Sequence, residues 1–230
     1  MTLSTNYVSN NANVGNPNLG GIMTEGSQST SVTQLGYTGD NFPLIGGSAW
    51  GIAAAYAYSQ NMAAGIGTPI SQQFGTTGSS NNVAISGYWV PEKTGFIPSV
   101  STGWGQGTYE NAVAWSNKNW TKTSSWYLGL QWPDTFFKGN DLGMALGQSP
   151  FMTNNGAGTY SAANGINGNL DSNYMWEWWY KFQVTDNITV TPALYYIQNY
   201  DGQLGKVGTS GAYNATDNVF GGLLKTTFKF

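Results

Sequence analysis

The amino-acid sequence predicts an all-β protein, an antiparallel transmembrane β-barrel, and three observations lead to that class. Stretches of about ten residues alternate between apolar and polar side chains, as strands with two different faces do. Only 8% of the 230 residues are charged, against about 25% in soluble domains, whereas 15% are aromatic. Short and long connections alternate between these stretches, which is typical of barrels with periplasmic turns and extracellular loops.

The stretch from 172 to 200 shows the alternation most clearly. Between Tyr174 and Val184 every even-numbered residue is aromatic or valine, whereas the odd-numbered residues include both charges, Glu177 and Lys181. Alternate residues of a strand face opposite sides of a sheet, so this strand has one apolar face and one mixed face. The pattern resumes at Ile188 after a turn at 185–187, which predicts a β-hairpin.

The same alternation recurs along the rest of the chain, at 49–60, 95–105, 122–132, 141–148 and in the last residues up to Phe230. With a first strand at 3–9, about ten strands are expected. Short connections are expected at 91–95, 133–141 and 185–187, and long, polar, glycine-rich ones at about 9–28, 61–80, 107–121, 150–171 and 201–215. The sequence thus predicts one β region over 1–230, with neither a second domain nor a long helix.

The missing residue types exclude several classes of function. The chain contains no cysteine and no histidine, and each of its 8 basic residues is a lysine. Disulfides, thiol catalysis, cysteine zinc sites and histidine acid–base chemistry are therefore excluded. The net charge of −3 provides no basic patch, so no nucleic-acid partner is expected.

The carboxylates and the glycine-rich segments do not combine into a catalytic site. Asp134, Asp141 and Asp171 could act as acid–base carboxylates, but they lie in expected turns and loop ends, where aspartate commonly caps the backbone. The segment GWGQGTYE (103–110) is similar to a phosphate-binding loop but lacks a lysine and a following helix. We therefore expect no enzyme activity, no cofactor and no metal site.

Five residues with a charge or an amide on the mixed faces are candidates for the lining of a pore: Glu177, Lys181, Gln183, Lys225 and Lys229. Glu177 and Lys181 are four residues apart, which is roughly 13 Å along a strand, and Lys225 and Lys229 have the same spacing. Such charges could tune the electric field inside a pore, or they could be solvated charges with no selective role. In either case they should avoid lipid, where a lysine at the midplane costs about 2–4 kcal/mol.

The apolar faces carry the residues that we expect to contact lipid. Aromatic side chains are enriched where a barrel meets the two membrane interfaces. The expected aromatic girdle consists of Trp126, Trp132, Trp176, Trp178, Tyr180, Phe228 and Phe230. The opposite faces are rich in Gly, Ala, Ser, Thr and Gln, which are small or polar and suit a wet interior.

Three segments resemble a known family. They are SGYWVPEKTGFIPSVSTGWG (86–105), WYLGLQWPDTFFKGNDLGMALGQ (126–148) and NYMWEWWYKFQVTDNITVTPALYY (173–196). They are similar to the C-terminal barrel region of cyanobacterial porins of the carbohydrate-selective OprB-like family, often called iron-uptake porins, and the similarity runs from about 28 to 230. The amphipathic last strand, which ends on Phe230, likewise resembles the assembly signal of outer-membrane porins.

The resemblance implies a place in the bacterial outer membrane and a barrel larger than this chain, of about 16–18 strands. Family members carry a surface-layer-homology domain and a helical segment before the barrel, so we expect this chain to be the C-terminal part of a porin. A complete ten-stranded barrel is the alternative, with a lumen nearly filled by side chains. The implied partners are outer-membrane lipid, the barrel-assembly machinery acting on the last strand, and small solutes; a homo-oligomer is left open.

The expected function is therefore that of a porin that passes small hydrophilic solutes by diffusion. Sugars, inorganic ions and iron species are the candidate solutes. Two alternatives remain, namely a barrel with an adhesive role and a soluble or secreted β-protein that binds carbohydrate. The latter should carry charged residues over one face of its strands, and the sequence lacks such a face.

Overall fold

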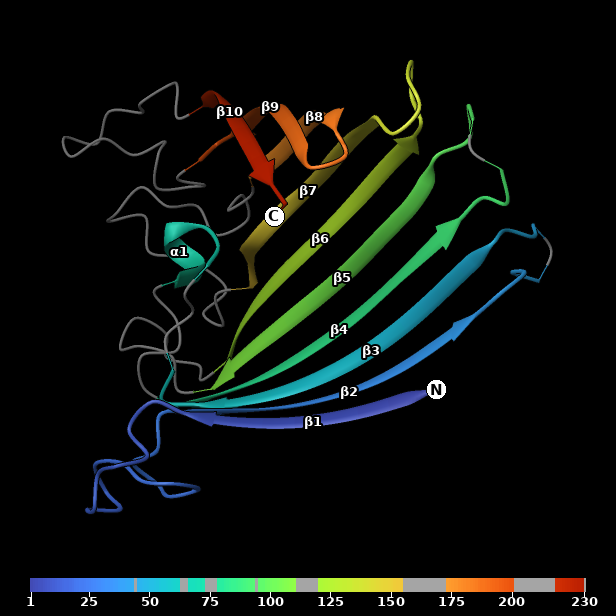
Figure 1. Ribbon diagram of the computed structural model, residues 1–230. Coiled ribbons are helices and arrows are strands. Elements are labelled where there is room, and N and C mark those ends of the chain that lie inside the picture. Colours follow the sequence, from blue (N-terminus) through green and yellow to red (C-terminus); the bar gives the residue numbers. More distant parts are fainter. Residues whose placement is uncertain are drawn as a thin grey trace.

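Ten strands form one antiparallel sheet in the computed structural model (Figure 1). The structure describes residues 1–43, 45–62, 66–72, 78–93, 95–110, 120–154, 173–200 and 218–229. The strands are β1 (Thr2–Ser9), β2 (Ser29–Gly39), β3 (Ala49–Gln60), β4 (Ser79–Val90), β5 (Ser99–Glu110), β6 (Trp120–Pro133), β7 (Asp141–Asn154), β8 (Tyr174–Thr185), β9 (Ile188–Gln198) and β10 (Val219–Phe228). One short helix, α1 (Pro69–Gln72), lies between β3 and β4. The expected all-β class with about ten strands is confirmed.

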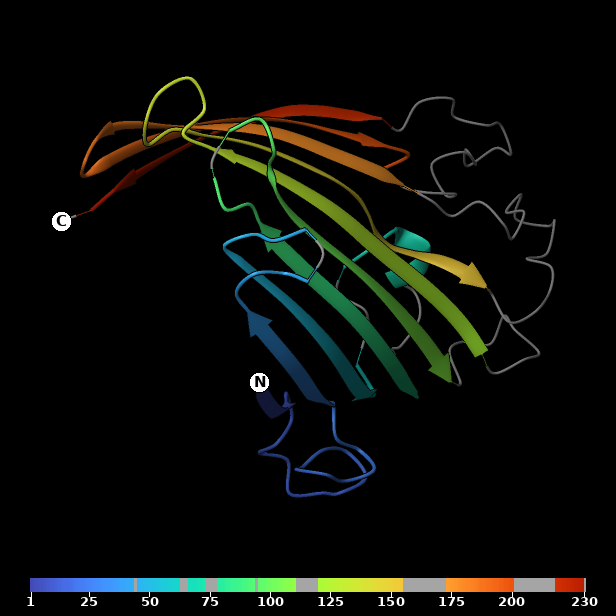
Figure 2. The ribbon, with the colours of Figure 1, turned by 90° about the vertical axis from the view of Figure 1, so that its right-hand side faces the viewer.

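Each strand pairs with its neighbours in sequence, so that the order in space runs from β1 to β10. Among the described residues β1 pairs only with β2 and β10 only with β9, so both edges of the sheet are unpaired. Figures 1 and 2 show a sheet that is curved but not closed. The structure thus has the pairing of an up-and-down barrel without its closure.

The connections alternate between the two ends of the sheet. Those at 40–48, 91–98, 134–140 and 186–187 lie at one end, which we call the short-turn end. The strand ends at Ser9 and Ser29, Gln60 and Ser79, Glu110 and Trp120, Asn154 and Tyr174, and Gln198 and Val219 are at the other end, which we call the long-loop end. In the sequence most of the segments that join these strand ends are much longer than the short turns. An antiparallel meander forces this separation, because every second connection returns to the same end. The short turns are on the upper right of the sheet in Figure 1.

Two strands are longer than the sequence predicted. β5 extends to Glu110 and β7 to Asn154, so the expectation of loops from 107 and from 150 is wrong by a few residues. β7 continues through Pro150 because its register against β6 shifts between Ser124 and Trp126. Bulges are among the few places where a strand tolerates proline, and alternation alone does not reveal them.

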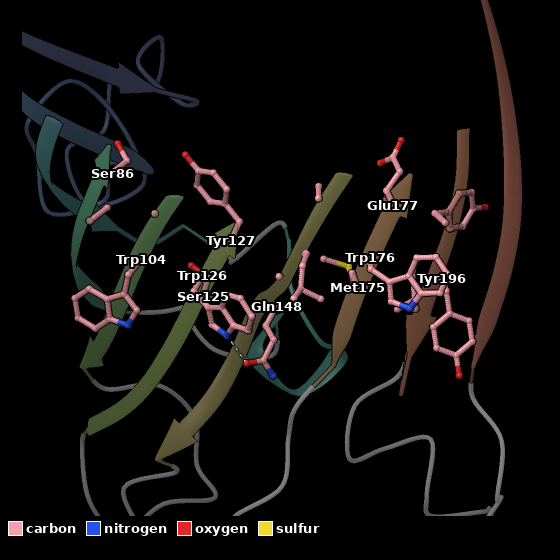
Figure 3. Close-up of a pocket in the computed structure, with 18 of the residues that line it drawn as sticks. Ser86, Trp104, Ser125, Trp126, Tyr127, Gln148, Met175, Trp176, Glu177 and Tyr196 are labelled. Carbon is pink, nitrogen blue, oxygen red and sulfur yellow. Dashed lines mark hydrogen bonds between the residues drawn. The ribbon is translucent and has the colours of Figure 1, made fainter. Parts of the chain in front are cut away.

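The register joins the alternating patterns of the strands into two continuous faces, because directly paired residues point to the same side. The apolar face includes Leu35, Ile52, Ile85, Trp104, Trp126, Leu146, Trp176, Tyr196 and Phe220. The polar face includes Gly51, Ser86, Gly103, Tyr127, Ala145, Glu177, Tyr195 and Gly221. Figure 3 shows the alternation, with Tyr127 and Glu177 on the opposite side of the strands from Trp104, Trp126 and Trp176.

Neither face packs against a second layer in the described part of the chain. Of its apolar residues only Tyr109, Met152 and Ala193 are buried. On the apolar face Trp178 is 41%, Leu194 53% and Ile85 59% exposed. A soluble sandwich would bury such a face, since burying one large apolar side chain is worth about 1.5–3 kcal/mol. The exposed apolar face therefore argues against the soluble alternative and is typical of a surface that contacts a membrane or a partner.

In the described part of the chain the helical content is confined to the single turn of α1. Within the described ranges no helix is both long enough and apolar enough to cross a membrane.

Candidate pore surface

The polar face consists of small and hydroxylated side chains over most of its width. From β1 to β6 its described residues are Gly, Ala, Ser, Thr, Asn, Gln, Val, Pro and Tyr, and none of them is charged. Such side chains are short, so they leave space in front of the sheet, and most of them can bind water. The polar face therefore has a composition that suits contact with water. The described charged residues of this face are confined to β7, β8 and β10 and to Lys229 after β10.

One ion pair lies on the polar face. The ammonium of Lys181 on β8 pairs with the carboxylate of Asp141, its direct cross-strand partner on β7. The side chain of Lys181 is 38% exposed and that of Asp141 14%. Asp141 is thus the first residue of a strand and the counter-ion of a predicted pore-lining lysine.

The remaining charges of this face have no opposite charge beside them in the described structure. Glu177 is aligned with Ala145 on β7 and with Tyr195 on β9. Lys225 on β10 is exposed and is aligned with Thr191. Lys229 follows β10, and its backbone N–H donates to the carbonyl of Asn187 over 2.9 Å, which continues the register beyond the strand.

Gln183 lies at the short-turn end of the polar face. Its backbone N–H donates to Oδ1 of Asn140 over 2.9 Å, and its side chain covers Gly139 of the β6–β7 turn. All five candidate pore-lining residues are therefore on one face by register. Their role in a pore stays a prediction.

Four large aromatic side chains of the polar face lie against glycines of the neighbouring strand. The direct cross-strand pairs are Tyr88 with Gly51, Tyr127 with Gly103, Trp179 with Gly143 and Tyr195 with Gly221. A Cβ atom added at Gly51 or at Gly103 would lie 2.5 Å from Cε1 of its tyrosine, so each ring occupies the place where another side chain would begin. Aromatic side chains that cover glycines in this way stabilise a sheet, and here they also turn the outer side of each ring toward the space in front of it.

The connection that contains α1 reaches across the polar face to β7. The N–H of Thr68 donates to the carbonyl of Pro150 over 2.9 Å, and Oγ of Ser71 donates to the same carbonyl over 2.8 Å. Thr68 and Ser71 are almost fully buried. Pro150 shares a hollow with Ala57 and other small residues of the polar face. The connection leaves β3 and docks beyond β5 and β6 on this side of the sheet, and Figure 1 shows α1 there.

The predicted girdle residues lie on the apolar face, as far as they are described. The indole N–H of Trp126 donates to Oε1 of Gln148 over 2.6 Å, as Figure 3 shows, and that of Trp132 donates to the carbonyl of Phe96 over 2.9 Å. Trp176 packs on Tyr196 with ring centroids 5.7 Å apart. Trp178 and Phe228 are on the same face by register, and Phe230 lies outside the described residues.

Tyr180 binds the β6–β7 turn through two hydrogen bonds. Its hydroxyl donates to the carbonyl of Thr135 over 2.7 Å and accepts from the amide of Asn140 over 3.1 Å. Its ring lies 6.1 Å from that of Phe136, which is 81% exposed. Tyr180 thus joins the apolar face of β8 to the β6–β7 turn.

The candidate acid–base carboxylates are not assembled into a site. Asp134 accepts a hydrogen bond from the N–H of Gly139 over 2.7 Å and so closes its own turn. Asp141 is paired with Lys181, and Asp171 lies outside the described residues. The segment 103–110 is part of β5 rather than a phosphate loop. No group of three or more His, Cys, Asp or Glu side chains that could hold a metal ion occurs in the part of the chain that the structure describes.

Comparison with known proteins places the chain in a family. The family model described as "Carbohydrate-selective porin, OprB family" matches residues 1–230. An uncharacterised protein of Synechocystis sp. is 27% identical over 252 residues, which cover 100% of this chain and 41% of the relative. An uncharacterised protein of Nostoc sp. is 26% identical over 248 residues, which cover 100% of this chain and 36% of the relative. No solved structure matches the chain significantly.

The chain therefore spans about two fifths of the length of these cyanobacterial relatives. The family match and the observed sheet agree, because a porin barrel is built from such strands, with one apolar and one polar face. The resemblance seen in the three aromatic-rich segments is confirmed, and the chain belongs to the OprB family of carbohydrate-selective porins.

Proposed function

We propose that the protein is an outer-membrane porin, in which small hydrophilic solutes diffuse along the polar face. The observation that carries this proposal is the single sheet with a continuous apolar face, a continuous polar face and almost no buried core in its described part. A sheet of this kind is stable where lipid covers one face and water the other. Membership of the porin family supports the same conclusion.

We infer that the ten strands are part of a larger barrel, of about 16–18 strands, in the whole protein. The unpaired edges at β1 and β10 support this, since every unsatisfied backbone group in lipid costs several kcal/mol. The greater length of the relatives would provide the remaining strands. The amphipathic β10 and the final Phe230 would be the part that the barrel-assembly machinery recognises.

The whole protein would act by diffusion without turnover chemistry. The candidate solutes are sugars, inorganic ions and iron species, and the family description favours sugars. The charges on the polar face would add a weak selectivity among ions. The polar face carries three lysines and two carboxylates, which leaves one positive charge in excess among the described residues. A weak preference for anions is therefore expected.

Conductance across a planar lipid bilayer tests this function. The whole protein, purified in detergent, should produce stepwise openings in potassium chloride, with a reversal potential in a salt gradient that indicates a weak preference for chloride. A protein that inserts into the membrane but conducts no current would contradict the porin function and would favour an adhesive barrel.

A further inference from the structure

The polar face contains a hollow with aromatic walls toward the short-turn end. Its lining includes the side chains of Tyr88, Tyr127 and Trp179, together with Ser99, Ser101 and Gln131. The volume of the hollow is ≈ 430 Å³. Pockets that bind small molecules commonly measure about 300–1,000 Å³ and combine aromatic walls with a few polar groups. The hollow therefore has the size and the composition of a ligand site.

Glycine positions fix the orientation of the three rings. Tyr88, Tyr127 and Trp179 each rest on the glycine directly opposite on the neighbouring strand, so their rings cannot sink further toward the sheet. The outer side of each ring is left free, and Tyr88 and Tyr127 remain 44% and 45% exposed. These rings are held in place before any ligand arrives, which reduces the entropy lost on binding.

The polar groups around the rings are free to accept and donate hydrogen bonds. The hydroxyls of Ser99 and Ser101 and the amide of Gln131 have no side-chain hydrogen bond to other residues in the described ranges, nor have the hydroxyls of Tyr88 and Tyr127. A ligand with several hydroxyl groups could bond to them at its rim while its flat side lies on a ring. Aromatic faces attract C–H groups because their π-systems are negative.

The charges near the hollow favour a neutral ligand. Lys181, two residues beyond Trp179 on the same strand face, is neutralised by Asp141. Glu177, two residues before Trp179, is aligned with Ala145, which also lines the hollow. A single carboxylate beside the rings would repel an anion but can accept hydrogen bonds from hydroxyl groups.

We propose that this hollow is a binding station of the pore, in which the rings of Tyr88, Tyr127 and Trp179 stack on successive pyranose rings of a neutral oligosaccharide. The proposal rests on the proposed porin function and adds the residues by which the pore would hold a sugar. Tyr195 makes the same contact with Gly221 but is not part of this hollow, so the ring–glycine contact alone does not define the station. The station is distinguished by the combination of three rings and free polar groups that line the same hollow.

Blockage of the current by maltotriose tests the station in the whole protein. In a bilayer, added maltotriose should reduce the potassium chloride current in a saturable way. Replacing Tyr127 by leucine should raise the half-blocking concentration about tenfold, because a stacking face worth about 1–1.5 kcal/mol is lost. Tyr127→Phe keeps the face and should stay within about twofold of the wild type.

Two further variants separate binding from folding. Trp178→Leu alters the residue next to Trp179 on the opposite face and should leave the half-blocking concentration unchanged. Tyr88→Leu repeats the test from β4 if Tyr127→Leu fails to assemble. A wild-type pore that conducts but is not blocked by maltotriose would overturn the station and leave the porin function intact. Equal blockage of the wild type and of both leucine variants would also overturn it, whereas a protein without conductance would contradict the porin function itself.

Discussion

Lys181 of β8 and Asp141 of β7 are direct cross-strand partners, and their side chains form an ion pair on the polar face. The pairs on either side align Lys181 with Thr191 of β9, which is in turn aligned with Lys225 of β10. Lys181 and Lys225 are therefore two strands apart in one row, about 10 Å from each other. Because Asp141 neutralises the first lysine, Lys225 supplies the uncompensated positive charge of this row.

Removing the carboxylate of Asp141 should make the pore more selective for anions. Asp141→Asn leaves the ammonium of Lys181 unpaired beside that of Lys225, so the local positive charge rises by one. The reversal potential in a potassium chloride gradient should move toward that of chloride, and the shift should shrink at high salt, since the screening length is about 10 Å at 0.1 M and about 3 Å at 1 M.

The double variant is the control for this effect. Asp141→Asn combined with Lys181→Gln removes both charges and should restore the wild-type reversal potential. Stability should change by no more than about 1 kcal/mol, because the pair is partly exposed to water. An Asp141→Asn pore with unchanged selectivity would mean that this row does not face the path of the ions.

Reversing the charge of the two C-terminal lysines should have the opposite effect. Lys225→Glu with Lys229→Glu replaces two positive by two negative charges on exposed side chains, and the pore should then prefer cations. The reversal potential in a salt gradient is the measurement. Lys138→Glu, in the exposed β6–β7 turn, is the control; it reverses one charge instead of two and should shift the reversal potential by much less than half as much. A shift half as large as that of the double variant would argue that only the overall charge matters.

Alternation along the sequence was sufficient to predict the two faces. The alternation assigns Trp176, Trp178 and Tyr180 to one face of β8 and Glu177 and Lys181 to the other, and the pairing of β8 with β7 and β9 has the same two faces. Each strand of an antiparallel meander pairs with its neighbour, so the period of two in the sequence is transmitted directly to the sheet.

The contacts between residues of different strands could not be predicted from the sequence, because they depend on the register in which the strands pair. The pairing of Lys181 with Asp141 and of Trp179 with Gly143 joins residues of different strands, and nothing within one strand indicates which partner it meets. The docking of Ser71 on Pro150 was missed for the same reason, since it joins residues that are 79 positions apart. The sequence shows that the strands are rich in glycine, but it does not show that these glycines are paired with aromatic residues of the neighbouring strands.

Brominated lipid should distinguish the two faces of β8 by fluorescence. Trp176 and Trp178 are 37% and 41% exposed on the apolar face, whereas Trp179 lies on the polar face against Gly143. In variants that keep one of these three tryptophans as the only one in the chain, bromine should quench Trp176 and Trp178 strongly and Trp179 weakly. Equal quenching of all three would refute the assignment of the apolar face to lipid.

The contact between Trp179 and Gly143 should be the most sensitive of the ring–glycine contacts to an added methyl group. A Cβ at Gly143 would overlap the six-membered ring of the indole, so in Gly143→Ala the ring must leave its place. Overpacking of this kind costs about 1–3 kcal/mol, and the midpoint of unfolding in urea, followed in detergent, should fall accordingly. Gly222→Ala on β10 is the control, because its Cβ would meet Leu194 at an ordinary 3.4 Å.

Adding Trp179→Leu to Gly143→Ala should recover part of the loss, since the leucine leaves room for the methyl group. Losses that simply add in the double variant would show that Gly143 and Trp179 are not coupled, and the ring would then not be held by the glycine.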